Sequence, residues 1–322
     1  MPELSEVPLN PAYAPAEGHT PRVVSLLASA TEIVCALGMG ECLVARSHEC
    51  DWPEWVRQLP TVSAPTFDVS GTSAEIDREV RRRVEAGEPL YRLDAAEIEA
   101  LGAEILFAQE HCEVCAVTPG DLSRAGCATP GAQVMALTAG TLEGIFLGME
   151  RVAAALGVPE RGQALVAAEQ ARLQRVRERC ADRAAPTVVV LEWADPIFAM
   201  GNWGPELVEA TNGQLLLGRR GEHSQAIPWE QVLEADPEVL VVAPCGYDLA
   251  RAAQELPLLR ARPGWNGLRA VQRGRVAIAD GNRYFNRSGM TVVETAEILA
   301  EMLHGVVVDG QTEGRHWRWL CA

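Results

Sequence analysis

The chain has 322 residues, of which 48% are hydrophobic and 22% are charged, so it is expected to fold rather than to be disordered. This length favours two domains, each large enough to bury a core of its own. All 28 basic side chains are arginines, and 44 acidic residues leave a net charge of −16. A nucleic-acid-binding protein needs a basic face, so nucleic acid is excluded as an expected partner.

The cellular compartment is predicted from the start of the chain and from its cysteines. The apolar run 23–39 follows acidic residues rather than a basic segment, which is not typical of an export signal, and it is too short and polar to span a bilayer. The nine cysteines are odd in number, which is typical of reduced thiols. A cytoplasmic protein without disulfides is expected.

The first half of the chain alternates apolar strands with helices. Residues 1–21 are predicted to be a flexible N-terminal arm. Ser29 and Glu32 have the spacing of a capping box after the first strand, so a helix is expected to start at Ser29. Residues 70–89 form a polar, charged segment in which no helix or strand is predicted. The predicted strands are 22–27, 43–46, 104–108 and 133–137, and the predicted helices are 94–101 and 141–156.

A charged helical pattern at 159–182 contains no turn signal and is long enough to span roughly 35 Å. Strands then alternate with helices again, which is typical of a doubly wound parallel sheet. The prediction is an α/β protein with two lobes joined by a single long helix. The predicted strands are 188–191, 239–243 and 276–279, with helices at 205–211, 228–235, 249–259 and 291–303. The predicted boundaries are 1–21 (arm), 22–158 (first lobe), 159–183 (connecting helix), 184–305 (second lobe) and 306–322 (tail).

Aromatic and ligating side chains follow several of these strands. Glu192-Trp193 ends one strand, and Asn202-Trp203 lies in the loop beyond it. Ser47 to Pro53 and Gln109 to Val117 follow two strands of the first half. Open α/β sheets bind ligands at the carboxyl ends of their strands, so these segments predict a ligand site between the lobes. The alternative for either tryptophan alone is an ordinary core aromatic.

Several long strings resemble one family of proteins. SLLASATEIVCALG, RSHECDWP, FAQEHCEVCAV and LEWADPIFAMGNWGPELVEATNG are similar to segments of the cobalamin and iron-siderophore binding family of periplasmic-type solute-binding proteins. The likeness is greatest to its branch without an export signal, described as cobalamin-binding. The resemblance implies two Rossmann-like lobes joined by one helix, the class III solute-binding protein fold, which closes only slightly over its ligand. It implies a bound corrinoid and no catalysis.

The strand-end segments and the resemblance together predict the residues of the site. A corrin is broad, flat and mostly apolar with a fringe of amides, so stacked aromatic rings and a few polar groups suit it. His48 or His111 is a candidate axial ligand of the cobalt, because neutral imidazole binds such metals well. The predicted ligand-binding residues are Ser29, Thr31, His48, Glu49, Cys50, Trp52, Phe67, Gln109, His111, Cys112, Trp193, Phe198, Asn202, Trp203, Ser224, Trp229 and Phe285.

The sequence departs from the family at three places. Asn202 stands where that branch has histidine, and Ser288-Gly289-Met290 stands where it has a proline-rich string. Members that serve an importer present one surface acid on each lobe to the ABC permease. Glu230 lies near the second of these positions, but Ala96 beside Glu97 lies near the first. Docking to a permease is therefore not favoured, and a carrier, salvage or sensor role is expected.

Two alternative functions remain open. The first is binding of another metal chelate, haem or an iron-siderophore complex, for which Arg219, Arg220, Arg283 and Arg287 are candidate anion-binding residues. The second is a metal or redox enzyme that uses the CxxC pair Cys112 and Cys115, also candidate metal ligands. The chain has no dinucleotide, phosphate-loop, nucleophile-elbow or zinc-protease motif, so no catalytic cofactor is expected. The sequence predicts no oligomeric state.

Overall fold

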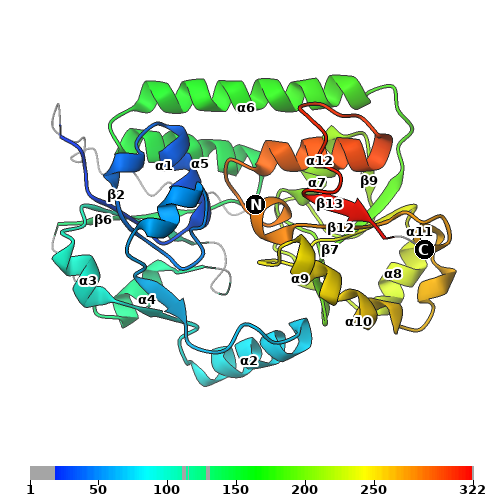
Figure 1. The fold of residues 1–322 in the computed structure, drawn as a ribbon, viewed down its shortest axis with the longest axis horizontal. Coiled ribbons are helices and arrows are strands. Elements are labelled where there is room, and N and C mark those ends of the chain that lie inside the picture. Colours follow the sequence, from blue (N-terminus) through cyan, green and yellow to red (C-terminus); the bar gives the residue numbers. More distant parts are fainter. Residues whose placement is uncertain (1–18, 111–113, 115, 128–130, 321–322) are drawn as a thin grey trace.

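The computed structural model describes residues 19–110, 114, 116–127 and 131–320. Two α/β lobes lie side by side, and the long helix α6 (Pro159–Cys180) runs along one side of both (Figure 1). The fold is the class III solute-binding protein architecture that the resemblance implies. Among the described residues, no helix is both long and apolar enough to cross a membrane.

The first lobe is built on a parallel sheet in the order β2-β1-β5-β6. Every side chain of its inner strand β5 (Ile105–Gln109) is buried, which requires cover on both faces of the sheet. The other strands are β1 (Val23–Ser25), β2 (Leu43–Arg46) and β6 (Gln133–Leu137), with a small antiparallel pair β3 (Ser63–Pro65) and β4 (Tyr91–Leu93). The helices are α1 (Ala28–Ala36), α2 (Ser73–Ala86), α3 (Ala95–Ala100), α4 (Pro119–Arg124) and α5 (Leu142–Ala155), and a 3₁₀ turn η2 covers Glu54–Gln58.

The second lobe has a mixed sheet in the order β10-β8-β7-β11-β12-β13, and β9 also pairs with β7. Its centre is parallel: β7 (Thr187–Ala194), β11 (Val239–Val242) and β12 (Val276–Ala279). The outer strands are β8 (Ile197–Ala199), β9 (Gln214–Leu215), β10 (Gln225–Ala226) and β13 (Trp317–Trp319). The helices are α7 (Gly204–Ala210), α8 (Trp229–Ala235), α9 (Leu249–Gln254), α10 (Leu256–Arg260), α11 (Arg269–Gln272) and α12 (Val292–His304), with a π-helical turn η4 (Gly281–Phe285).

The structure corrects three details of the predicted elements. Residues 70–89 contain a fourteen-residue helix, α2, whose N-terminus is capped by Thr72 and Glu75 and whose end is Gly87 in the left-handed region. Helix α1 begins at Ala28, so Ser29 lies inside it and makes no cap bond. The predicted helix 249–259 is two helices, because the chain bends at Glu255 before Pro257.

One continuous hydrophobic core joins the two lobes. It contains Met149 of α5, Leu173 and Val176 of α6, Val190 of β7 and Leu299 of α12, all 1% exposed or less. Burial of apolar surface is the main favourable term in folding. Helix α6 is therefore an integral part of both lobes, and the joint between them is stiff.

Candidate functional site: the cleft between the lobes

The loops that follow β2 and β12 meet across the gap between the lobes. Arg287 of the second lobe donates from Nη1 to Glu32 Oε1 at 2.7 Å and to Asp51 Oδ1 at 2.8 Å, both in the first lobe. Asn282 Nδ2 donates to Asp51 Oδ2 at 3.0 Å. The lobes also touch at Gly289, where a Cβ atom would lie 2.7 Å from Ser29 Cβ. The loop after η4 therefore closes directly onto α1.

This cross-lobe cluster is a buried ionic network. Burial raises the pKa of Glu32, and the neighbouring Arg287 opposes that rise. Burial alone would lower the pKa of Arg287, but the carboxylates of Glu32 and Asp51 raise it instead. Within the described residues, Ser29 Oγ, Glu32 Oε2 and Arg283 Nε are buried without a hydrogen-bond partner. These three atoms at the junction can therefore form further hydrogen bonds.

Aromatic rings from both lobes lie at the junction between the lobes. Trp52 of the first lobe is 41% exposed, and the guanidinium of Arg283 lies over its ring at 3.7 Å. In the second lobe Trp193 lies 5.2 Å from Tyr247, with the two rings tilted. Such rings offer flat apolar faces with one polar atom each, which suits a planar ligand.

His48 lies in the loop after β2 and is held as a neutral imidazole. Its Nδ1 is 2.8 Å from Ser63 Oγ, and its ring is 5.4 Å from that of Tyr91. Burial and then the nearby Arg46 lower the pKa of His48 to about 4. The other ring nitrogen, Nε2, is 4.0 Å from Glu49 Oε1. A neutral imidazole oriented through one nitrogen is the state that ligates a metal.

Two other predicted residues of this region serve the loop itself. Thr31 Oγ1 donates to Ser25 Oγ at 2.8 Å and to Cys50 Sγ at 3.0 Å. Cys50 is fully buried, and its burial raises the pKa of the thiol. A buried, protonated thiol is unreactive, so Thr31 and Cys50 fix the shape of the loop and present no chemistry to a ligand.

Comparison with known proteins finds relatives of this chain. Residues 126–282 match the family model described as periplasmic binding protein. A vitamin B12-binding protein of Vibrio campbellii is 25% identical over 231 residues, 70% of this chain and 71% of the relative.

The chain is similar to the periplasmic binding proteins of this family.

Solved structures of binding proteins share the fold of this chain. A periplasmic heme-binding protein of Pseudomonas aeruginosa superposes with a TM-score of 0.70 at 22% identity, covering 94% of this chain and 98% of the other. A periplasmic vitamin B12 binding protein of Vibrio cholerae superposes with a TM-score of 0.63 at 20% identity, covering 88% and 96%. These matches are all binding proteins, and the chain is a solute-binding protein rather than an enzyme.

Three predicted cleft aromatics lie in the cores of this solute-binding protein. Trp203 is 5% exposed in the core shared by the lobes, and Phe285 is fully buried there. Trp229 is 6% exposed in a second core, where its ring stacks 6.2 Å from Trp265 and its Nε1 donates to Pro263 O at 2.8 Å. These rings are packed against apolar neighbours, so they offer no face to a ligand in this conformation. Their role as cleft-lining residues stays a prediction, which the Trp203 variants described below test.

The remaining predicted residues are distributed as follows. The guanidinium of Arg83 lies over the ring of Phe67 at 5.4 Å, and Ser224 Oγ accepts from Gly201 N at 3.0 Å. Asn202 has a left-handed backbone with φ of 50°, and its N donates to Glu222 O at 2.6 Å. Gln109 is buried, while Glu49 and Phe198 are half-buried. His111, Cys112 and Cys115 lie outside the described residues. Within the described part of the chain, no group of three or more candidate side chains is arranged to hold a metal ion.

The candidate arginines for an anionic siderophore are engaged by acids or by an aromatic ring. Arg287 is held by Glu32 and Asp51, and Arg283 covers Trp52. Arg219 and Arg220 are exposed and pair with Glu222 at 3.6 Å and Glu206 at 2.8 Å. The arrangement therefore has aromatic rather than cationic character.

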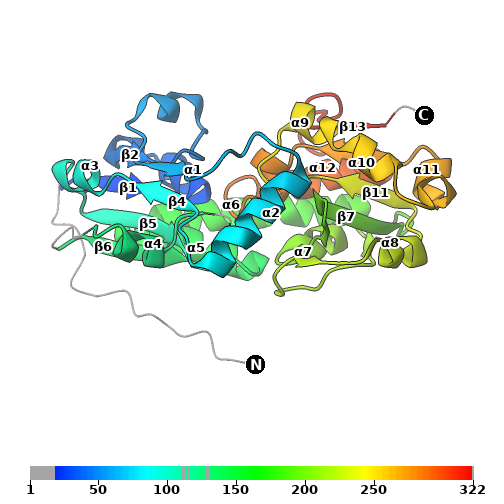
Figure 2. The same ribbon diagram turned by 90° about the horizontal axis from the view of Figure 1, so that it is seen from below.

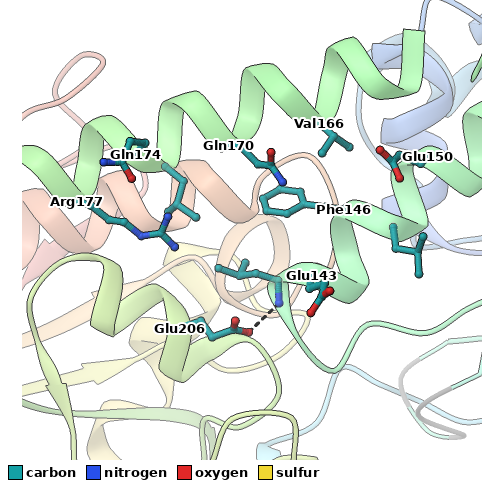
Figure 3. Close-up of a pocket in the computed structure, with 11 residues that line it drawn as sticks. Glu143, Phe146, Glu150, Val166, Gln170, Gln174, Arg177 and Glu206 are labelled. Carbon is teal, nitrogen blue, oxygen red and sulfur yellow. Dashed lines mark hydrogen bonds between the residues drawn. The ribbon is translucent and has the colours of Figure 1, made fainter. Parts of the chain in front are cut away.

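Two surface hollows lie beside α6, away from the predicted site. The first, about 680 Å³, is lined by α5 and α6 around Phe146 and Val166 (Figure 3). The second, about 490 Å³, shares Arg177 and Glu206 with it. Leu142 N donates to Glu206 Oε2 at 2.8 Å and ties the lobes on this side. None of the predicted ligand-binding residues lines either hollow, so we place the candidate site in the cleft on chemical grounds.

Sequence reasoning missed the residues that connect the lobes. Arg287 was considered only as a siderophore ligand, and Tyr247, Ser73 and Glu255 were not considered. Helix α2 could have been predicted from the sequence. Thr72-Ser73-Ala74-Glu75 is a capping-box pattern, and Gly87 follows where the helix ends. No local pattern indicates which acid a distant arginine will reach.

Proposed function

We propose that this solute-binding protein binds a corrinoid of the cobalamin type in the cleft between its lobes, as a cytoplasmic carrier, salvage or sensor protein. The similarity to a vitamin B12-binding protein supports the ligand class. The free thiols of Cys35, Cys42, Cys50, Cys127, Cys180 and Cys245 support a reducing compartment.

The observation that carries the proposal is the state of His48. A neutral imidazole, fixed by Ser63 and half-buried in the loop that carries Asp51, is the donor that cobalt of a corrinoid accepts as an axial ligand. Trp52 and Trp193 supply flat faces from opposite lobes for the corrin ring. The unpartnered Ser29 Oγ and Glu32 Oε2 suit the amides at its rim once the lobes separate slightly.

Calorimetry with purified protein tests the ligand class. Cyanocobalamin, adenosylcobalamin, aquocobalamin, haemin and a ferric siderophore are titrated in turn. We expect stoichiometric binding of at least one corrinoid at micromolar concentration and no binding of the siderophore. Failure of every corrinoid at that concentration would refute the proposal.

Replacing His48 tests its role. We expect aquocobalamin to change its visible spectrum on binding to the wild type, because the imidazole displaces the water on cobalt. We expect His48→Gln to abolish this change and to weaken binding by roughly tenfold or more, as loss of a metal ligand does. His19→Gln, a change of an exposed histidine in the same lobe, serves as the control. Identical spectra for the wild type and His48→Gln complexes would rule out axial ligation.

The pH dependence of binding follows from the same residue. A protonated imidazole cannot ligate a metal, and the pKa of His48 is lowered to about 4. We therefore expect aquocobalamin affinity to stay constant from pH 8 to about pH 5 and to fall only as the pH approaches the pKa of about 4. A fall centred near pH 6.5, the value of an unperturbed histidine, would contradict a buried neutral imidazole.

Haem is the second candidate ligand. His48 and Tyr91 lie with their rings 5.4 Å apart, and both residue types serve as haem-iron ligands. The haemin titration distinguishes the two candidate ligands, because haem binding stronger than corrinoid binding would favour haem.

A further inference from the structure

A segment of the first lobe reaches across the cleft to the second lobe. Residues 66–90, here called the strap, leave β3, turn at Thr72 and return along α2 to β4. Both views show α2 between the two lobes, on the side away from α6 (Figure 1 and Figure 2). At the base of the strap, Thr66 N donates to Leu90 O at 2.9 Å and Arg83 Nη1 donates to Thr66 Oγ1 at 2.9 Å. The strap is thus a closed loop anchored in the first lobe.

The tip of the strap is bound to the second lobe by a buried carboxylate. Ser73 Oγ donates to Glu255 Oε2 at 2.5 Å, and Ser73 N donates to Glu255 Oε1 at 3.4 Å. Ser73 is fully buried and Glu255 is 4% exposed. Hydrogen bonds to a charged acceptor in such surroundings are about twice as strong as neutral ones. This pair is therefore one strong polar attachment of the tip.

Two further side chains of the second lobe hold the same tip. Trp193 Nε1 donates to Ser73 O at 3.2 Å. Arg251 Nη2 donates to Val69 O at 2.9 Å and to Gly71 O at 2.7 Å. The carbonyls before α2 are thus held by donors that the second lobe places in the cleft. Trp193, which was predicted as a ligand-binding residue, also fastens the strap.

The contacts of the tip favour its local detachment from the second lobe. It consists mainly of hydrogen bonds, with the partly buried Ile76 packed against the small cluster around Tyr247. The lobes, in contrast, are joined through a continuous apolar core. Segments with few buried apolar contacts open at a lower free energy than the cores they cover.

We infer that the strap is a latch on the ligand cleft, and that a ligand enters or leaves only after the tip has detached from the second lobe. The inference rests on the proposed cleft site. The shared core and α6 join the lobes on the opposite side, so a ligand that enters between the lobes from the side away from α6 passes the strap. Attachment of the tip would then set the rate of ligand exchange.

Hydrogen–deuterium exchange of the ligand-free protein tests the attachment. We expect Glu255→Ala and Ser73→Ala to speed exchange within 66–90 by about tenfold, the factor that corresponds to a loss of about 1.4 kcal/mol. Exchange in α6 should not change. Glu234→Ala, which removes an exposed acid from the same lobe, is the matched control. Unchanged exchange of the strap in both variants would overturn the inference.

Ligand dissociation tests the latch itself. We expect cyanocobalamin to leave Glu255→Ala and Ser73→Ala about tenfold faster than it leaves the wild type and Glu234→Ala. Faster exchange of the strap with unaltered dissociation would overturn the latch role. If no corrinoid binds, the proposed function fails, and the same comparison is made with haemin. Failure of the proposed ligand and failure of the latch role can therefore be told apart.

Discussion

Arg287→Ala is expected to lower the free energy of unfolding by about 3–5 kcal/mol, because it leaves the buried carboxylate of Glu32 without its cation. Arg287 is 6% exposed and lies 2.7 Å from Glu32 and 2.8 Å from Asp51. Urea denaturation at pH 7 measures the loss. Arg260→Ala removes an exposed arginine of the same lobe and should change stability by less than about 0.5 kcal/mol.

The pH dependence of that loss identifies its cause. Burial raises the pKa of Glu32, so without Arg287 the folded state takes up a proton above the pH at which the unfolded state does. Stability then falls as the pH rises through that interval. The loss in Arg287→Ala should therefore be smaller at pH 5 than at pH 7. A loss equal at both pH values would contradict an ionic origin.

Trp203→Ala is expected to cost about 3–5 kcal/mol of stability, as truncation of a buried aromatic ring does. The ring is 5% exposed in the core that joins the lobes. Trp203→Phe keeps most of that packing, so it should retain most of the stability and the full ligand affinity. Urea denaturation and calorimetry on the same samples measure the two quantities.

Trp52→Ala is the matched comparison for this prediction. Trp52 is 41% exposed and borders the cleft under Arg283, so its removal should cost about 1 kcal/mol or less of stability and should weaken ligand binding. A Trp203→Phe protein with normal stability and no ligand affinity would show that Trp203 belongs to the site after all.

The fold was largely predictable because its elements carry local signals. The strands 43–46 and 133–137 and the connecting helix from Pro159 stand where apolar runs and helix stop signals put them. The start of α1 was misjudged, because the capping-box spacing of Ser29 and Glu32 is only a local preference. In the structure Glu32 binds Arg287 of the other lobe, and a contact so distant in sequence leaves no local trace.

The site was predictable only in outline. The loop around Asp51 follows β2 and the loop around Arg287 lies beyond β12, so each leaves the carboxyl edge of its own sheet, and the two loops meet between the lobes. Strand-end position did not distinguish Trp52, which is exposed there, from Trp203, which is buried beyond it. Both are tryptophans in polar loops after strands, and the direction of each ring depends on tertiary packing.

The apolar core shared through α6 also limits how this protein can signal that it is loaded. Moving one lobe away from the other would expose part of that core, at about 25 cal/mol for each Å² of apolar surface. Because exposing this apolar surface to water is unfavourable, wide opening of the lobes is opposed. A recipient protein would then have to distinguish the loaded form by the position of the strap, because the separation of the lobes would differ little between the empty and occupied forms.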